Sequence, residues 1–148
     1  MTNATAACVV DASVVIKLFI TEPLSERAET LFTGLAAGSQ VFLVPDLLYV
    51  ECTNILWKNV RRAGLAKVDA HEILRRLRAL ALHVTPTAEL CESALALALE
   101  RDISAYDACY VELARRRSVP LVTADERLAR KVSAVHDVRS LAALTATE

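Results

Sequence analysis

Several features that the sequence lacks narrow the classes of protein to which it can belong. No stretch reaches the roughly 18 uninterrupted apolar residues that a membrane-spanning helix requires, and the longest uncharged run, residues 30–45, contains two glycines and several polar residues. The N-terminus carries no basic segment, so we expect no secretory signal. The net charge is −1, so the charge of the whole chain gives no indication of nucleic-acid binding. These absences predict a protein that does not associate with a membrane.

The cysteines and histidines do not form the pattern of a disulfide framework or of a zinc site. The four cysteines have no C-x-x-C spacing and lie within apolar runs, and the three histidines are far apart in the chain. Small buried thiols of this kind are typical of proteins in a reducing compartment. We therefore expect a cytoplasmic protein whose cysteines are free and buried.

Apolar residues are abundant, at 54% of the chain, and short apolar runs alternate with helical patterns. The runs predict strands at residues 7–11, 41–44, 83–85 and 120–123, with a final edge strand near residues 135–138. Helices are predicted between them, over residues 14–20, 24–35, 46–63, 71–81, 88–101, from about 106, and over 124–132. Asp46 is expected to cap the third of these helices, and Gly64 to end it.

Continuous apolar strands separated by helices predict the fold class. Such a pattern is typical of α/β proteins with a mostly parallel sheet that is buried on both faces. The length of 148 residues fits one domain, and no repeat or linker divides the chain. We therefore expect a single α/β domain over residues 1–148, with four or five strands flanked by helices on both faces.

Two acids are predicted to lie at one edge of this sheet. Asp11 directly follows the run CVV at the carboxyl end of the first strand, and Asp125 follows PLVTA just beyond another strand. In open α/β sheets, ligands bind outside the carboxyl ends of the strands. Asp11 and Asp125 should therefore share the edge at which a ligand would bind.

Two further acids lie in apolar helices that could pack over that edge. Glu51 occurs in LLYVECTNIL, where Leu47, Glu51 and Ile55 are expected on one helix face. Asp107 occurs in SAYDACYVELA, at the head of an apolar stripe that continues through Tyr110. A carboxylate drawn into apolar surroundings is costly unless it is paired, hydrogen-bonded or bound to a metal.

Each acid taken singly also has a purely structural interpretation. Asp11 could cap the helix that follows it, and Ser104 and Asp107 have the spacing of a capping box, with the carboxylate near the positive end of the helix dipole. Thr123 and Glu126 have the same spacing next to Asp125. These residues leave open whether the acids are helix caps or ligands.

Taken together, the four acids favour a divalent cation. Carboxylates a few ångströms apart repel by roughly 1 to 4 kcal/mol per close pair, unless a cation neutralises them or some of them stay protonated. A set without His or Cys favours Mg²⁺ or Mn²⁺ over Zn²⁺. Three polar residues could support such a site: Ser13, Asn54 and Thr123.

The segments that carry these acids resemble the motifs of a known family. CVVDASVVIKLF, PDLLYVECTNIL, SAYDACYVELA and PLVTADERLAR, in this order, resemble the motifs of PIN-domain ribonucleases, and above all of the VapC-type toxins of prokaryotic toxin–antitoxin pairs. The likeness extends from about Cys8 to about Val138. The resemblance implies that Asp11, Glu51, Asp107 and Asp125 bind Mg²⁺ or Mn²⁺ for the cleavage of an RNA phosphodiester bond. It also implies that Ser13, Asn54 and Thr123 are the supporting polar groups.

The resemblance implies partners as well: an RNA substrate, a second copy of the chain, and an antitoxin that covers the active-site groove. Tyr106 and Tyr110 could line that groove, although Tyr110 fits a core position equally well. The candidates for contact with the RNA backbone are Lys17, Lys58, Arg61 and Arg62, with residues 115–117 as a further basic group.

Two other functions remain compatible with the sequence. One is a PIN nuclease of RNA processing that has no antitoxin. The other is a non-catalytic α/β binding module, in which the acids are only helix caps. A signalling receiver domain is less compatible, because it needs paired acids after the first strand and a lysine late in the sheet, and CVVDAS and PLVTAD supply neither.

Overall fold

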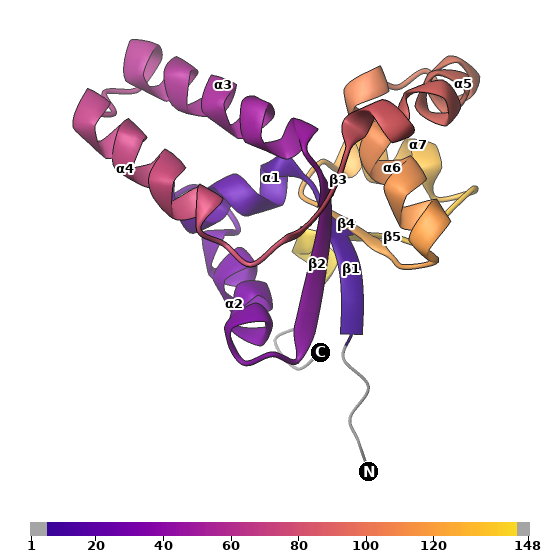
Figure 1. Cartoon of the computed structure of the whole chain (residues 1–148), viewed down its shortest axis with the longest axis horizontal. Helices are drawn as coiled ribbons and strands as arrows, with labels where there is room; N and C mark the ends of the chain where they lie inside the picture. Colours follow the sequence, from indigo (N-terminus) through magenta and orange to yellow (C-terminus); the bar gives the residue numbers. More distant parts are fainter. Residues whose placement is uncertain (1–5, 145–148) are drawn as a thin grey trace.

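The computed structural model describes residues 6–144, in which five strands form one sheet (Figure 1). The strands are β1 (Ala6–Val10), β2 (Gln40–Pro45), β3 (His83–Thr85), β4 (Leu121–Thr123) and β5 (Val138–Ser140). Every pairing is parallel, and the strand order is β3-β2-β1-β4-β5. The predicted parallel α/β sheet is confirmed.

The helices cover both faces of the sheet because strands are added first on one side of β1 and then on the other. The α-helices are α1 (Ala12–Val15), α2 (Ser25–Ala36), α3 (Leu47–Arg62), α4 (Lys67–Arg78), α5 (Cys91–Arg101), α6 (Ala105–Arg117) and α7 (Glu126–Val132). Short 3₁₀ turns are η1 (Ile16–Leu18), η2 (Thr87–Glu89) and η3 (Leu141–Ala143). Crossovers between parallel strands are right-handed, so the helices between β1 and β3 lie on one side and those between β3 and β5 on the other. Figure 1 shows α1–α4 and α5–α7 on these two sides.

The strand order places a topological switch point between β1 and β4. From β1 the chain moves outward through β2 to β3, and it then returns to the other side of β1 to add β4 and β5. In open α/β sheets, ligands bind at such a point, in the crevice outside the carboxyl ends of the two central strands. Asp11 follows β1 and Asp125 lies two residues beyond β4, so both flank this point.

The core consists of the apolar strands and of the inward faces of the helices. Val9, Val10, Phe42 and Val44 are fully buried in the central strands. Helix α6 is buried along its whole middle, from residue 108 to 114, because it packs on β1, β2 and β4 and is also covered by α5. The apolar stripe predicted for SAYDACYVELA is therefore only one part of a helix that is buried on most of its surface.

Some element boundaries differ from the prediction. Helix α4 begins at Lys67 and ends at Arg78. Its early start was not predicted, because no side chain of its first turn is buried. Helix α5 begins at Cys91 because residues 87–89 form a separate 3₁₀ turn. The edge strand β5 begins only at Val138, because the amides of Val135 and His136 donate to the carbonyl of Val132 and so end α7.

The cap of α3 differs in its chemistry. Asp46 occupies the N-cap position, but its carboxylate accepts hydrogen bonds from the amide and the hydroxyl of Thr87 and caps no amide of α3. The hydroxyl of Thr87 instead accepts from the Leu47 amide at 2.9 Å. The prediction for Asp46 was therefore right in position and wrong in partner. Gly64 follows the end of α3 with a φ of +76°, as a helix-terminating glycine should.

Two further sequence expectations concern the cysteines and membrane spans. All four cysteines are free, but Cys91 is exposed, which corrects the expectation that all would be buried. Within residues 6–144, no helix combines the length and the apolar character that spanning a membrane requires.

Candidate active site

Asp11 is a buried carboxylate held by three hydrogen bonds at the carboxyl end of β1. It is 5% exposed, and it accepts from the Ser13 hydroxyl at 2.5 Å, from the Thr123 hydroxyl at 2.5 Å and from the Val14 amide at 3.3 Å. The Val14 bond makes Asp11 the N-cap of α1, as one interpretation of the sequence predicted. Burial raises the pKa of Asp11 to about 6, with a further increase from the charge of Asp107, while the Ser13 and Thr123 hydroxyls oppose the shift.

Ser13 and Thr123 tie the end of β1 to the end of β4. The Ser13 hydroxyl accepts from the Ala124 amide at 3.0 Å, and the Thr123 hydroxyl accepts from the Asp125 amide at 3.0 Å. The predicted capping box between Thr123 and Glu126 is wrong. Helix α7 begins at Glu126, so Asp125 is the N-cap, and its carboxylate accepts from the Leu128 amide at 3.1 Å. The Thr123 hydroxyl therefore does not cap α7, and it donates to Asp11 instead.

Asp107 lies in the first turn of α6, where Ser104 is the N-cap. The Ser104 hydroxyl accepts from the Asp107 amide at 3.0 Å, which is one of the two bonds of the predicted capping box. Burial raises the pKa of the Asp107 carboxyl and the charge of Asp125 raises it further, while the Ser104 hydroxyl lowers it. The cap and the electrostatic cluster therefore coexist at one helix terminus.

Glu51 lies at the edge of the buried stripe of α3. That stripe is Leu48, Cys52 and Leu56, and Glu51 is half-buried beside it. The Tyr110 hydroxyl donates to Glu51 Oε1 at 2.7 Å. Burial raises the pKa of Glu51 and the charge of Asp107 adds to this, while the Tyr110 hydrogen bond lowers it.

These interactions show that the four acids share one electrostatic environment. Asp107 raises the pKa of both Asp11 and Glu51, and Asp125 raises that of Asp107. The acids come from four separate places in the chain: the end of β1, helix α3, helix α6 and the loop after β4. Asp107 is therefore coupled by charge to each of the other three acids, and their convergence into one metal site stays a prediction.

The four acids do not form a closed cage. Within residues 6–144, no three His, Cys, Asp or Glu side chains form a group arranged to hold a metal ion. The chemistry of the donors nevertheless suits Mg²⁺ or Mn²⁺, because the acids offer only oxygen ligands. Mg²⁺ commonly uses one or two carboxylates, and it completes its coordination with water and phosphate oxygens. Burial and nearby negative charge also disfavour the charged forms of Asp11, Glu51 and Asp107, and a cation would relieve that repulsion.

Two of the other predicted residues do not join the cluster. Asn54 is exposed on α3 and makes no hydrogen bond to the four acids in the described part of the chain. Lys17 binds Glu22 at 2.7 Å, and only 11% of its side chain is exposed, so it is not available for an RNA backbone. Lys58, Arg61 and Arg62 are exposed near the end of α3, where the Arg61 guanidinium lies 5.9 Å from the Trp57 ring centre.

The hydrogen bond from the Tyr110 hydroxyl to Glu51 is the contact that the sequence did not predict. Tyr110 is a core residue with 1% exposure, and Tyr106 is exposed. The signal in the sequence was its place one turn after Asp107 on the same helix face. That spacing puts a carboxylate and a hydroxyl side by side, but it does not reveal that Glu51 would be the acceptor.

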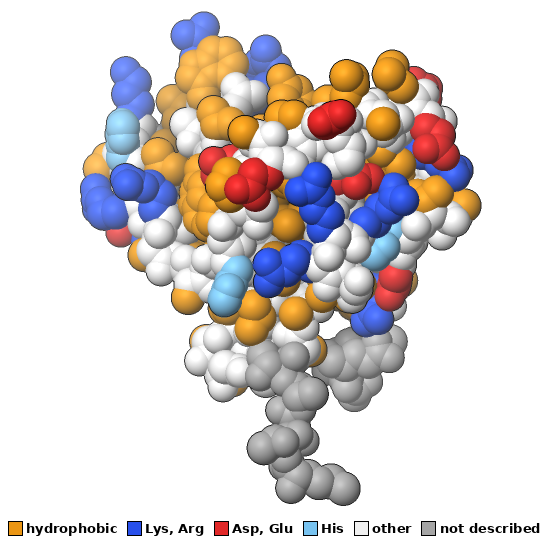
Figure 2. Space-filling model, turned by 45° about the vertical axis from the view of Figure 1, so that its right-hand side comes forward, with side chains coloured by type: hydrophobic (Ala, Val, Ile, Leu, Met, Phe, Trp, Pro, Cys, Tyr) orange, Lys and Arg blue, Asp and Glu red, His pale blue; other side chains and the backbone are white. Residues whose placement is uncertain are grey.

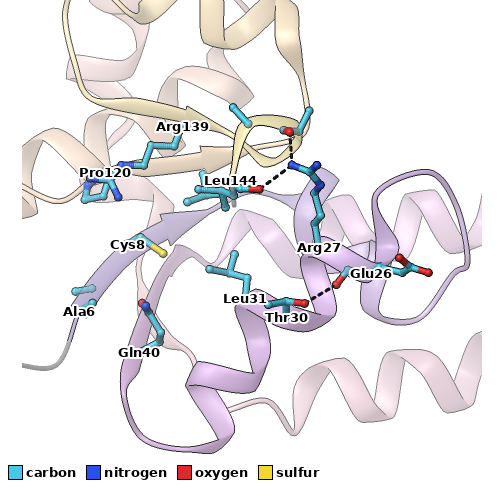
Figure 3. Close-up of a pocket in the computed structure, with 14 residues that line it drawn as sticks. Ala6, Cys8, Glu26, Arg27, Thr30, Leu31, Gln40, Pro120, Arg139 and Leu144 are labelled. Carbon is cyan, nitrogen blue, oxygen red and sulfur yellow. Dashed lines mark hydrogen bonds between the residues drawn. The ribbon is translucent and has the colours of Figure 1, made fainter. Parts of the chain in front are cut away.

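A cavity of about 660 Å³ lies away from these acids (Figure 3). It is bounded by the start of β1, by α2 and by the chain around residues 142–144, and Arg27 reaches across to the carbonyls of Ala142 and Leu144. Ala6 and Gln40 begin their strands, so the cavity opens at the amino ends of the sheet, and none of the four acids lines it. The candidate active site is therefore the open acidic edge and not this cavity.

Comparison with known proteins gives a consistent picture. Residues 8–133 match the family described as PIN domain. The chain is 38% identical over 129 residues to Ribonuclease VapC3 of Pyrobaculum aerophilum. This alignment covers 86% of this chain and 95% of that protein.

Solved structures show the same fold. The structure of PAE2754 from Pyrobaculum aerophilum aligns with a TM-score of 0.65 and 26% identity, and it covers 85% of this chain and 86% of that one. VapBC2 from Rickettsia felis, bound to a DNA fragment from its promoter, includes a chain that aligns with a TM-score of 0.66 and 12% identity. That alignment covers 90% of this chain and 98% of the other. The protein therefore belongs to the PIN-domain family, and within it to the VapC-type ribonucleases.

Proposed function

We propose that the protein is a Mg²⁺- or Mn²⁺-dependent endoribonuclease that acts as the toxin of a VapBC-type pair. The observation that carries this proposal is the cluster of Asp11, Glu51, Asp107 and Asp125 at the switch point between β1 and β4. The 38% identity to a VapC ribonuclease supports the reaction class. The cluster offers oxygen ligands at the place where an α/β sheet binds its ligand.

In this proposal the carboxylates bind the cation, and the neighbouring hydroxyls orient the carboxylates. The four carboxylates would hold the cation, which when bound supplies charge neutralisation at the phosphate and a more acidic water for hydrolysis. Ser13 and Thr123 fix the carboxylate of Asp11, because each hydroxyl donates to a different oxygen of it. Ser104 anchors the helix terminus from which Asp107 projects.

A cation would also let RNA approach this surface. Figure 2 shows acidic, basic and apolar side chains interspersed on one face, without a continuous basic patch. The protein is close to neutral overall, so long-range attraction of a polyanion is weak. The RNA backbone would therefore be held by the cation and, near the end of α3, by Lys58, Arg61 and Arg62.

Protein partners are part of the proposal. Large apolar side chains are exposed on α3, α5 and the first turn of α6: Val50, Trp57, Leu95, Leu99 and Tyr106. Exposed apolar groups of this size are typical of protein–protein interfaces. We assign them to a second copy of the chain and to a cognate antitoxin, the kind of partner that the VapBC2 complex contains.

The substitution Asp107→Asn tests the nuclease function. The purified protein should cleave RNA in Mn²⁺ and stop when the metal is chelated. Asp107→Asn should lower the rate by more than about 100-fold, because it removes a ligand charge at the centre of the cluster while keeping its shape. The unfolding midpoint and the circular dichroism spectrum should show that the fold is retained.

Asp102→Asn is the matched control, since that carboxylate is fully exposed five residues earlier and its αL backbone suits Asn. Full activity of Asp107→Asn would show that the residue is only a helix-terminal acid. Cleavage that persists after chelation would exclude the metal-dependent reaction.

Growth of cells that express the protein separates a toxin from a processing enzyme. Wild type expressed alone should arrest growth, Asp107→Asn should not, and co-expression of the antitoxin should restore growth. An active nuclease that leaves growth unaffected would instead support the role in RNA processing.

A further inference from the structure

The Tyr110 hydroxyl links helix α6, which carries Asp107, to helix α3, which carries Glu51. Tyr110 lies on α6, one turn after Asp107, and it donates to Glu51 Oε1 on α3 at 2.7 Å. Within residues 6–144, this is the only hydrogen bond that joins α3 to α6. The carboxylate from α3 is therefore tied to α6 by one side chain.

The position of Glu51 needs such an anchor. Helix α3 packs mainly against α4, and in Figure 1 these two helices extend to one side of the sheet, while α6 packs on the sheet itself. A glutamate side chain has several freely rotating bonds, and fixing it costs conformational entropy. Tyr110 is 1% exposed and packed on all sides, so its hydroxyl is a fixed point for Oε1.

Packing alone does not explain the hydroxyl. A phenylalanine would fill almost the same volume in the core, whereas a buried tyrosine hydroxyl needs a hydrogen-bond partner. Here the partner is a carboxylate from another helix, and that carboxylate is also a member of the acidic cluster. The hydroxyl therefore acts on the site and not only on the core.

We propose that Tyr110 is a positioning residue, whose hydroxyl holds Oε1 of Glu51 and so orients that carboxylate for the divalent cation. This inference rests on the proposed metal-dependent nuclease function. Groups that orient a ligand in this way are worth roughly 10- to 100-fold in metal affinity or activity when they are removed. Tyr110 touches neither the cation nor the RNA, and it acts only through Glu51.

The first test is the affinity for Mn²⁺, measured from the electron paramagnetic resonance signal of the free ion. Tyr110→Phe should bind Mn²⁺ roughly 10- to 100-fold more weakly than wild type. The matched control Tyr106→Phe loses the same hydroxyl from an exposed ring and should bind like wild type. Tyr110→Phe should also need more Mn²⁺ for half-maximal cleavage and should recover most of its rate at saturation. Wild-type affinity in Tyr110→Phe would overturn the inference.

A double-mutant cycle with Glu51→Gln separates positioning from structure. If Tyr110 acts through Glu51, Tyr110→Phe should cause little further loss of Mn²⁺ affinity once the carboxylate charge is gone. An undiminished loss in the Glu51→Gln background would mean that the hydroxyl acts through the general structure, and it would refute the proposal.

A third measurement leaves the core intact. The chain has three tyrosines, so the double variant Tyr49→Phe, Tyr106→Phe keeps Tyr110 as the only one. Saturation with Mn²⁺ should shift its near-ultraviolet absorption, because the acceptor of its hydrogen bond changes charge environment. No shift at saturation would count against the inference. A wild-type protein that neither binds Mn²⁺ nor cleaves RNA would refute the proposed function itself, and the inference would fall with it.

Discussion

At the scale of single residues, Asp11 shows how a structural role and a proposed chemical role coincide. Its carboxylate caps α1, and it also accepts from two hydroxyls, one of which comes from the neighbouring strand. These hydrogen bonds do not offset its burial, so its pKa is raised to about 6. The ionised form of Asp11 is thus less stable in the folded protein than in the unfolded chain.

This shift predicts the pH dependence of stability in the metal-free protein. A carboxyl whose folded pKa is raised binds its proton more tightly when folded, so the contribution of Asp11 to stability is highest below pH 4 and falls as the pH rises through 6. Asp11→Asn removes this titration, so it should be more stable than wild type above pH 6, by up to about 3 kcal/mol. The two proteins should converge near pH 4.

Chemical denaturation in EDTA at pH 4, 5, 6 and 7.5 would measure this difference. A difference that stays constant over this range would contradict the assignment of the shift to Asp11. Thr30→Val, on the exposed face of α2, is a control that should show no such pH dependence.

At the scale of elements, the N-terminus of α6 combines a helix cap with a proposed metal ligand, and substitutions can separate these two roles. Ser104 caps the helix through the Asp107 amide, while the Asp107 carboxylate faces the acidic cluster. A cap contributes to helix stability, and a ligand contributes to the reaction. Changes at the two positions should therefore affect different measurements.

Ser104→Ala should lower the free energy of unfolding by about 1 kcal/mol, because the Asp107 amide loses its hydrogen-bond acceptor. Cleavage should be retained in that variant when it is assayed well below its unfolding midpoint. Urea denaturation and an RNA cleavage assay on the same preparation would measure both. A loss of cleavage as large as that of Asp107→Asn would show that the hydroxyl takes part in the site directly.

At the scale of the whole molecule, repulsion between carboxylates lowers the stability of the metal-free fold. Asp11 and Asp125 follow the adjacent strands β1 and β4, and burial and mutual repulsion raise the pKa values of Asp11, Glu51 and Asp107. A ligand that binds only the folded state stabilises it by mass action. A divalent cation bound by these acids should therefore stabilise the entire fold.

Mn²⁺ should raise the thermal unfolding midpoint of wild type, with a stabilisation of about 2.7 kcal/mol when its concentration is 100 times the dissociation constant. Asp107→Asn should show a much smaller increase, because it lacks the central carboxylate. Differential scanning calorimetry with and without Mn²⁺ would measure both. An equal increase in the two proteins would place the cation elsewhere.

Much of this molecule follows from local patterns in the sequence. The strands, most helices, the parallel sheet and the position of Asp11 and Asp125 at its carboxyl edge were predictable, because apolar periodicity and strand-end residues act over only a few positions. The exact starts of α4 and α5 were not, since the first turn of α4 has no buried side chain and residues 87–89 before α5 form a separate 3₁₀ turn.

Only the tertiary structure decided the contacts between distant segments. Thr87 donates a hydrogen bond to the carboxylate of Asp46, 41 residues away in the sequence, and Tyr110 donates one to Glu51, 59 residues away. Lys17, a predicted contact to the RNA backbone, is bound by Glu22, and Asn54, a predicted supporting group, faces solvent. The physical reason is that a hydrogen bond between distant residues depends on how two elements pack, and spacing along the chain does not encode that geometry.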